Sequence, residues 1–259
     1  MMTTGKVMLV GAGPGDPELL TLKAIRAIEA ADAVVYDRLV SPEVMALVPP
    51  GRRMISVGKE AGFHSVPQDQ INRLLVDLAR EGLTVVRLKG GDPLIFGRGS
   101  EEAEELRAAG IAVEYIPGIT AAQGAASSTG VPLTHRGLAT GVRYVTGHRA
   151  RDAALDLDWE SLVSPDTTLV IYMGAANMAT IARELIARGL PATTPAMAVA
   201  SATTPRECRV VARLDRIACE AEGLPAPVLF FVGRTVSLVA AQGLPCGDWP
   251  ERLGAAAHA

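Results

Sequence analysis

The sequence predicts an α/β fold divided into two domains. Short runs of Val, Ile and Leu alternate along the chain with segments that repeat apolar residues at helical spacing. Gly and Pro residues separate these segments and mark the turns between them. The chain has 259 residues, of which 49% are hydrophobic, and this length allows one large domain or two modest ones, each with a substantial core.

The first half of the chain is predicted to form a parallel β-sheet. The predicted strands are residues 7–10, 33–36, 53–57, 84–88 and 112–116, and the predicted helices are residues 20–31, 42–48, 67–80 and 101–109. Ser100 is expected to cap the last of these helices. Because strand, helix and strand follow one another, neighbouring strands are expected to be parallel, and ligands bind beyond the carboxyl ends of such strands.

The second half begins after Pro117 and Gly118, where the pattern of predicted elements changes. We place the domain boundary there. Its predicted strands are residues 143–146, 168–173, 196–200, 209–211 and 228–232, and its predicted helices are residues 120–128, 177–188 and 213–222. Residues 207–211 follow their neighbouring strand too closely for a helical crossover, which predicts antiparallel pairing there. The predicted domains are therefore residues 1–116 and 117–243, followed by a flexible tail at residues 244–259.

Composition excludes several functional classes. A net charge of −3 with 20% charged residues argues against a general nucleic-acid binder. The amino terminus has no signal-peptide pattern, and no apolar run approaches the roughly 18 residues that span a bilayer, so we expect a cytoplasmic protein without a membrane partner. The three cysteines (Cys208, Cys219 and Cys246) and the four histidines show no ligand spacing, so no metal site is expected.

A glycine-rich turn directly follows the first predicted strand. Gly11 and Gly13 predict that another group approaches the main chain closely. The dinucleotide fingerprint Gly-x-Gly-x-x-Gly would place a third glycine where Asp16 stands, and this carboxylate would repel a phosphate. Pro14 and Pro17 stiffen the loop, which favours a fixed wall beside a ligand. A tight strand-to-helix turn without any ligand remains an alternative.

The sequence resembles the tetrapyrrole (corrin/porphyrin) methylase family over nearly its whole length. The matching stretches are residues 10–24 (VGAGPGDPELLTLKA), 34–41 (VVYDRLVS), 87–99 (RLKGGDPLIFGRG), 117–122 (PGITAA), 132–136 (PLTHR) and 172–174 (YMG). This resemblance implies two α/β domains with the active site in the cleft between them, S-adenosylmethionine as methyl donor, and commonly a homodimer.

The resemblance also implies which residues bind the cofactor. The positions that match the family's contacts are Pro14, Gly90, Gly91, Asp92, Ile95, Thr120, Ala121, Met173 and Ala202. Apolar walls suit the adenosine, and the Asp92 carboxylate suits either the methionine ammonium or the ribose hydroxyls. At Ala202 relatives commonly have Gly, so this position departs from the family pattern.

The implied acceptor is uroporphyrinogen III, which carries several carboxylates. Arg38, Arg98 and Arg136 each lie within a matching stretch, and a guanidinium can pair with a carboxylate through two hydrogen bonds. Glu101 is expected to orient Arg98, and Met173 is expected to contact the acceptor as well as the cofactor. The alternative for each arginine is an ordinary solvated surface charge.

Methylation of a pyrrole carbon requires that a proton leave the macrocycle. By resemblance Asp37 is the proton acceptor and Lys59 the proton donor, while Asp37 as a simple turn residue is the alternative. Arg98 is a rival base, but arginine stays protonated and is expected mainly to steer carboxylates. The implied reaction is C-methylation at C2 and C7, giving precorrin-2 through precorrin-1 for sirohaem, cobalamin or haem d1 synthesis.

Two other functions remain open from the sequence. A related methylase acting on a later corrin precursor, on RNA or on diphthine would share the first glycine turn. A nucleotide-binding dehydrogenase or a non-catalytic binding module would bind NAD and not S-adenosylmethionine. The stretches at residues 87–99 and 132–136 favour the uroporphyrinogen acceptor.

Overall fold

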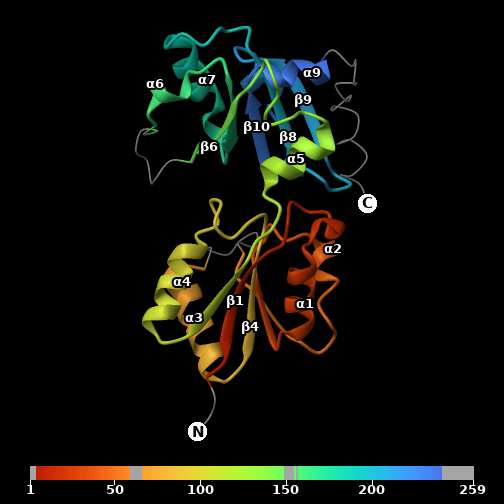
Figure 1. Cartoon of the computed structure of the whole chain (residues 1–259), viewed down its shortest axis with the longest axis vertical. Helices are drawn as coiled ribbons and strands as arrows, with labels where there is room; N and C mark the ends of the chain where they lie inside the picture. The colour runs from red at the N-terminus through yellow and green to blue at the C-terminus, as the bar shows by residue number, and fades with distance from the viewer. Residues whose placement is uncertain (1–3, 59–65, 149–154, 156, 241–259) are drawn as a thin grey trace. The chain divides into compact units, whose positions relative to one another are not determined.

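The chain forms two compact units, Met1–Gly124 (unit 1) and Ala125–Ala259 (unit 2), each with its own β-sheet (Figure 1). The computed structural model describes residues 4–58, 66–148, 155 and 157–240. The α/β fold expected from the sequence is confirmed. Pro117 and Gly118, the expected boundary, lie within unit 1, where the Gly118 N–H donates to Asp92. The expected tail, residues 244–259, lies outside the described residues.

Unit 1 contains a five-stranded parallel sheet in the order β3-β2-β4-β1-β5. The strands are β1 (Lys6–Gly11), β2 (Ala33–Tyr36), β3 (Arg53–Ser56), β4 (Thr84–Lys89) and β5 (Ala112–Ile116). Because all five strands run in the same direction, their carboxyl ends lie along one edge of the sheet. The loops after β1, β2 and β4 therefore meet at that edge, although they are far apart in the sequence.

Helices cover both faces of this sheet (Figure 1). The helices of unit 1 are the 3₁₀-helix η1 (Pro17–Leu19), α1 (Leu22–Ala30), α2 (Pro42–Met45), α3 (Gln68–Arg80) and α4 (Gly99–Ala108), and α5 (Ala121–Thr129) contains the boundary between the units. On one face, Ala24 and Ile28 of α1 pack against the strands. On the other, Leu75 of α3 and Leu106 of α4 do so. The apolar spacing within each helix thus selects the face that it buries.

Side-chain caps fix where the first helices begin. Thr21 caps α1 by accepting from Ala24 N, and Ser41 caps α2 by accepting from Val44 N. The Ser41 hydroxyl also donates to Gly15 O over 2.6 Å, which ties the first glycine loop to α2. The expected Ser100 cap of α4 is wrong. The helix begins at Gly99, so Ser100 lies in its first turn, and the N-cap residue is Arg98 in a left-handed conformation.

Unit 2 contains a mixed five-stranded sheet in the order β6-β7-β10-β8-β9. The strands are β6 (Gly141–Thr146), β7 (Thr167–Tyr172), β8 (Pro195–Ala200), β9 (Cys208–Arg213) and β10 (Val228–Val232). Strands β6 and β7 are parallel, and β10 is antiparallel to both β7 and β8. The antiparallel pairing expected from the short connection between β8 and β9 is confirmed.

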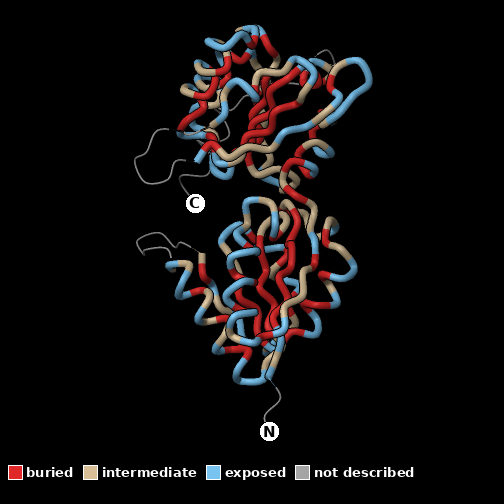
Figure 2. The backbone as a smooth tube through the Cα atoms, turned by 60° about the vertical axis from the view of Figure 1, so that its left-hand side comes forward, coloured by how far each residue is buried: buried red, intermediate tan, exposed pale blue. Residues whose placement is uncertain are grey.

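The helices of unit 2 are short apart from α7. They are α6 (Trp159–Leu162), η2 (Ala175–Asn177), α7 (Met178–Ala187), α8 (Ile217–Glu220), η3 (Arg234–Val236) and α9 (Ser237–Ala240). The helix expected at residues 213–222 is wrong in extent, because Arg213 pairs with Pro195 and ends β9. Buried residues are concentrated in the strands of each sheet (Figure 2).

Candidate functional site

The two glycine-rich loops of unit 1 are joined directly to each other. Strand β1 lies beside β4 in the sheet, so the loops that follow these strands meet. Gly91 N donates to Gly13 O over 2.7 Å, and Gly13 N donates to Gly91 O over 3.2 Å. Both loops therefore lie at the same edge of the sheet.

The close approach that the glycines predict is made by the protein's own main chain. A Cβ atom on Gly11 would lie 2.4 Å from Gly118 N, and one on Gly118 would lie 2.3 Å from Gly91 O. No side chain fits at either position. By contrast, a Cβ on Gly91 would have no neighbour closer than Ala121 N at 3.7 Å. The main chain of Gly91 is therefore more open to a ligand than that of Gly11.

Asp92 joins the second glycine loop to the segment after β5. Its Oδ1 accepts from Leu94 N over 2.8 Å and its Oδ2 accepts from Gly118 N over 3.1 Å. A carboxylate can accept about four hydrogen bonds, so each oxygen keeps capacity for a ligand donor. Thr120 and Ala121 follow directly and lie beside Gly91. Unit 1 thus brings together its sequence-predicted cofactor residues from both loops and from the segment after β5.

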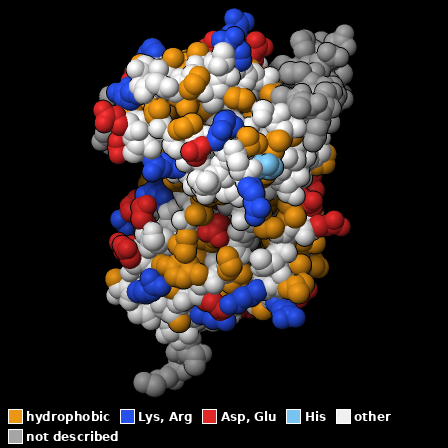
Figure 3. Space-filling model, turned by 45° about the horizontal axis from the view of Figure 1, so that its top comes forward, with side chains coloured by type: hydrophobic (Ala, Val, Ile, Leu, Met, Phe, Trp, Pro, Cys, Tyr) orange, Lys and Arg blue, Asp and Glu red, His pale blue; other side chains and the backbone are white. Residues whose placement is uncertain are grey.

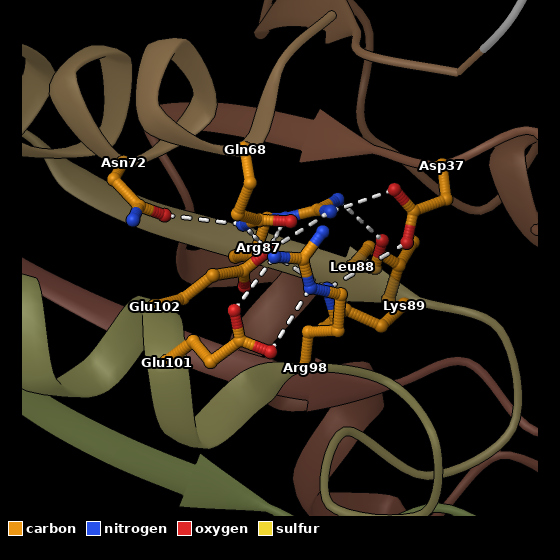
Figure 4. A network of polar contacts seen from close by, with 9 residues as sticks. All are labelled: Asp37, Gln68, Asn72, Arg87, Leu88, Lys89, Arg98, Glu101 and Glu102. Carbon is orange, nitrogen blue, oxygen red and sulfur yellow. Dashed lines mark hydrogen bonds and ion pairs between the residues drawn. The ribbon is translucent and has the colours of Figure 1, made fainter. Parts of the chain in front are cut away.

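A buried ionic cluster lies behind Asp37, at the carboxyl end of β2 (Figure 4). Arg87 Nη2 is 2.6 Å from Asp37 Oδ1, and Arg87 Nε donates to Glu102 Oε1 over 3.2 Å. Lys89 Nζ is 2.8 Å from Glu102 Oε1 and 3.8 Å from Asp37 Oδ2. The side chains of Arg87, Lys89 and Glu102, which we call the buried cluster, are 2%, 4% and 0% exposed, whereas Asp37 is 29% exposed. Asp37 is thus the member that solvent or a substrate can reach.

The sequence interpretation missed the buried cluster. Glu102 lies in the first turn of α4, where an acidic side chain suits the helix dipole. A signal was nevertheless present, because Arg87 and Lys89 are two residues apart in a strand and so point to the same face of the sheet. Two cations on a face covered by helices require buried anions.

Burial acts on the Lys89 ammonium of this cluster. It lowers the pKa of the Lys89 ammonium, the charge of Arg87 lowers it further, and the charges of Glu102 and Asp37 oppose these effects. Gln68 of α3 also donates to Glu102 Oε1, over 3.1 Å. Glu102 Oε2 is buried and has no hydrogen-bond partner among the described residues.

Arg98 and Glu101 form a bidentate ion pair at the start of α4 (Figure 4). Arg98 Nε donates to Glu101 Oε1 over 3.0 Å, and Arg98 Nη2 donates to Glu101 Oε2 over 2.6 Å. This hydrogen bonding raises the pKa of Arg98 and lowers the pKa of Glu101. Both side chains are about half exposed. The expectation that Glu101 orients Arg98 agrees with this geometry, and Arg98 stays protonated.

The other charged residues predicted for the site are Arg38, Lys59 and Arg136. Arg38 follows Asp37 and is exposed, and Gly58, in the loop after β3, packs against its main chain. Lys59 lies outside the described residues. In unit 2, Arg136 is exposed in a tight turn in which His135 and Ala139 hydrogen-bond to each other.

Unit 2 brings Met173 and Ala202 to one edge of its sheet. Met173 follows β7 and Ala202 follows β8, and these two strands run in the same direction on either side of β10. The main chain there is unusual. Met173, Ser201 and Thr203 have positive φ angles of 54°, 49° and 66°. Such conformations are costly for non-glycine residues and often mark functional sites.

Several features are not found within the described ranges. No group of three metal-ligating side chains occurs among them. No helix there is long and apolar enough to cross a membrane. On the surface drawn in Figure 3, Lys and Arg side chains are interspersed with Asp and Glu side chains. Around Asp37 and Arg98 the cations Arg87, Lys89 and Arg98 are each paired with a carboxylate.

Comparison with known proteins identifies relatives along most of the chain. A family model described as Tetrapyrrole (Corrin/Porphyrin) Methylases matches residues 6–218. A uroporphyrinogen-III C-methyltransferase of Paracoccus denitrificans is 65% identical over 243 residues, which are 93% of this chain and 85% of that protein. A siroheme synthase of Pseudomonas fluorescens is 52% identical over 92% of this chain, which spans about half of that protein's length (52%).

A solved structure resembles the chain closely. It is a uroporphyrin-III C-methyl transferase from Thermus thermophilus complexed with S-adenyl homocysteine. The two sequences are 43% identical, the match covers 90% of this chain and 100% of that one, and the TM-score is 0.78.

Proposed function

This chain belongs to the tetrapyrrole (corrin/porphyrin) methylase family, and from that premise we propose that it methylates uroporphyrinogen III with S-adenosylmethionine. Methylation at C2 and then at C7 gives precorrin-2 through precorrin-1, which feeds sirohaem, cobalamin or haem d1 synthesis. The name of the relative that is 65% identical over most of the chain supports this acceptor.

The observation that carries the proposal is the meeting of both glycine loops beside Asp37. Strands β2, β4 and β1 are consecutive in the sheet, so Asp37, Gly91 and Gly13 lie at the ends of neighbouring parallel strands. Such an edge is where open α/β sheets bind their ligands. A methyl transfer needs a cofactor site and a proton acceptor close together, and this edge supplies both.

The residues of unit 1 fit the cofactor. Pro14, Ile95 and Ala121 are partly exposed and offer apolar contact, the main chain of Gly91 is open, and the Asp92 carboxylate keeps capacity for ammonium or hydroxyl donors. We assign the cofactor to these residues together with Gly90, Thr120, Met173 and Ala202. When bound, S-adenosylmethionine supplies an electrophilic methyl group on its sulfonium sulfur.

The protein must accept a proton from the methylated macrocycle. Asp37 is a carboxylate with its Oδ1 held by Arg87, and it remains partly exposed, so it is placed to take that proton. We assign Lys59 as the proton donor. Arg98 is already paired with Glu101 and stays protonated, so its role is to hold a substrate carboxylate and not to act as a base.

The acceptor carboxylates require positive groups at the site. Arg38, Arg98 and Arg136 are exposed guanidinium groups available to such carboxylates. Glu101 contributes by holding Arg98, and Met173 contributes apolar contact with the macrocycle.

A product analysis tests this function. Purified protein incubated with S-adenosylmethionine and enzymatically prepared uroporphyrinogen III is expected to yield a product heavier by two methyl groups. A product without mass gain would contradict the proposal. Methylation of a later corrin precursor alone would identify a different member of the family, and binding of NAD without S-adenosylhomocysteine would indicate a nucleotide-binding protein.

We also assign a homodimeric, cytoplasmic state to the protein. This assignment rests on the family resemblance. Light scattering of the purified protein tests the dimer, and fractionation of cells that express the full-length protein tests its location.

A further inference from the structure

The charged side chains of the buried cluster come from two elements of unit 1. Arg87 and Lys89 project from β4, Glu102 projects from α4, and Asp37 lies at the exposed end (Figure 4). Two cations thus face two carboxylates. α3 contributes the neutral amide groups of Gln68 and Asn72. Arg98 and Glu101, at the start of α4, act on Glu102 and Lys89 through their charges.

Glu102 competes with Asp37 for the same two cations. Its Oε1 contacts Arg87 at 3.2 Å and Lys89 at 2.8 Å, while Asp37 contacts Arg87 at 2.6 Å and Lys89 at 3.8 Å. Charges in a buried site are screened far less than surface charges. Any change in Lys89 or Glu102 therefore alters the positive charge that Asp37 experiences.

The position of Asp37 also depends on the buried cluster. Arg87 is fully enclosed and is held on its other side by Glu102, so its guanidinium cannot move away without leaving a buried charge unpaired. It fixes Asp37 Oδ1 and leaves Oδ2 near Lys89. The arrangement holds one carboxylate in one orientation at the proposed site of proton transfer.

We infer that Arg87, Lys89 and Glu102 are positioning residues, which hold the Asp37 carboxylate and set the pH above which it accepts a proton from the substrate. The inference rests on the proposed role of Asp37 in methylation. It assigns opposite effects to Lys89 and Glu102. The lysine favours the ionised form of Asp37, and the glutamate opposes it by drawing the cations away and by its own negative charge.

Two substitutions, each to an uncharged side chain of similar size, separate these effects. Lys89→Met removes a cation, so the acid limb of the kcat profile is expected to move about one unit to higher pH. Glu102→Gln removes an anion, so that limb is expected to move to lower pH by a similar amount. Because both variants leave the cofactor residues in place, the KM for S-adenosylmethionine is expected to change little in either. Lys23→Met, which removes an exposed lysine paired with Glu114 at 2.7 Å, is the control and is expected to leave the profile unchanged.

A purely structural role predicts a different result. Loss of packing lowers activity or stability in both variants, but it does not move the acid limb in opposite directions. Coincident profiles for wild type, Lys89→Met and Glu102→Gln would overturn the inference, and so would shifts of the same sign.

A second measurement does not depend on activity. In protein labelled with ¹³C at the aspartate carboxyl groups, the Asp37 resonance is identified by its loss in Asp37→Asn. Its titration midpoint is expected to rise in Lys89→Met and to fall in Glu102→Gln. If the wild type fails to methylate uroporphyrinogen III, the proposed function fails. If Asp37→Asn retains full kcat, only the proposed role of Asp37 fails. In both cases this titration still decides on the buried cluster. Unmoved midpoints would overturn the inference even in an active enzyme.

Discussion

Gly13 and Gly91 hydrogen-bond to each other through their main chains in both directions. Both have positive φ angles, 70° and 68°, which favour glycine. The pairing joins the first and second glycine loops into one wall of the proposed cofactor site. Cofactor affinity and the free energy of unfolding should therefore both be measured for substitutions in this wall.

Gly91→Ala is expected to weaken cofactor binding. Alanine at a left-handed position costs about 1–2 kcal/mol, and the added methyl group would occupy the open space in front of the Gly91 main chain. Gly110→Ala is the matched control, because Gly110 has a φ of 75° and no neighbour within 4 Å of an added Cβ. Urea unfolding should show similar losses of stability for both variants, and calorimetry should show reduced affinity for S-adenosylhomocysteine only for Gly91→Ala. Equal affinities would contradict the placement of Gly91 at the cofactor.

Arg98→Ala is expected to impair use of the tetrapyrrole far more than binding of the cofactor. The guanidinium is half exposed and held by Glu101, which suits a carboxylate of the acceptor. Loss of one charged hydrogen-bonding group costs about 1.5–3 kcal/mol, so kcat/KM for the acceptor should fall roughly 10- to 100-fold. Arg213→Ala is the control, because Arg213 makes the same two-bonded pair with Asp215 in unit 2. Equal losses of acceptor use and cofactor affinity in Arg98→Ala would argue against this role.

Asp92→Asn is expected to reduce both stability and cofactor affinity. The carboxylate accepts main-chain N–H groups on both oxygens, and an amide can replace only one of these acceptors. The free energy of unfolding should fall by about 1–3 kcal/mol because one N–H group loses its partner. Asp158→Asn should have little effect, since Asp158 caps α6 with one oxygen and asparagine caps helices equally well. An unchanged affinity for S-adenosylhomocysteine in Asp92→Asn would remove Asp92 from the cofactor site.

Because of Lys89, the free energy of unfolding should depend on pH in the alkaline range. Burial lowers its pKa below the usual 10.5, so between the folded and unfolded pKa values the unfolded chain binds more protons. The free energy of unfolding therefore rises with pH in that window, by at most about 1.4 kcal/mol per pH unit. Below the folded pKa, the cost of burying the ammonium stays constant. Denaturant unfolding of wild type and Lys89→Met should show the wild type gaining relative stability as the pH approaches 10.5. A constant difference across that range would show that the Lys89 pKa is not lowered.

The sequence alone determined the local elements of the fold. The apolar runs located all ten strands found among the described residues, and β2, β5 and β10 have the expected bounds. The short connection before β9 indicated its antiparallel pairing. Asp37, which the family resemblance implies as the proton acceptor, follows β2 and lies at the carboxyl edge of the sheet. These features depend on short stretches of sequence, whose periodicity and turn residues act locally.

Only the tertiary structure decided which residues meet. The order of the strands places β4 between β1 and β2, so it brings Gly91 to Gly13 and Arg87 to Asp37. The same packing closes α4 over Arg87 and Lys89 and turns Glu102 from a helix-end charge into their buried partner. Sequence periodicity cannot determine this, because the protonation and pairing of a charge depend on what long-range packing places around it.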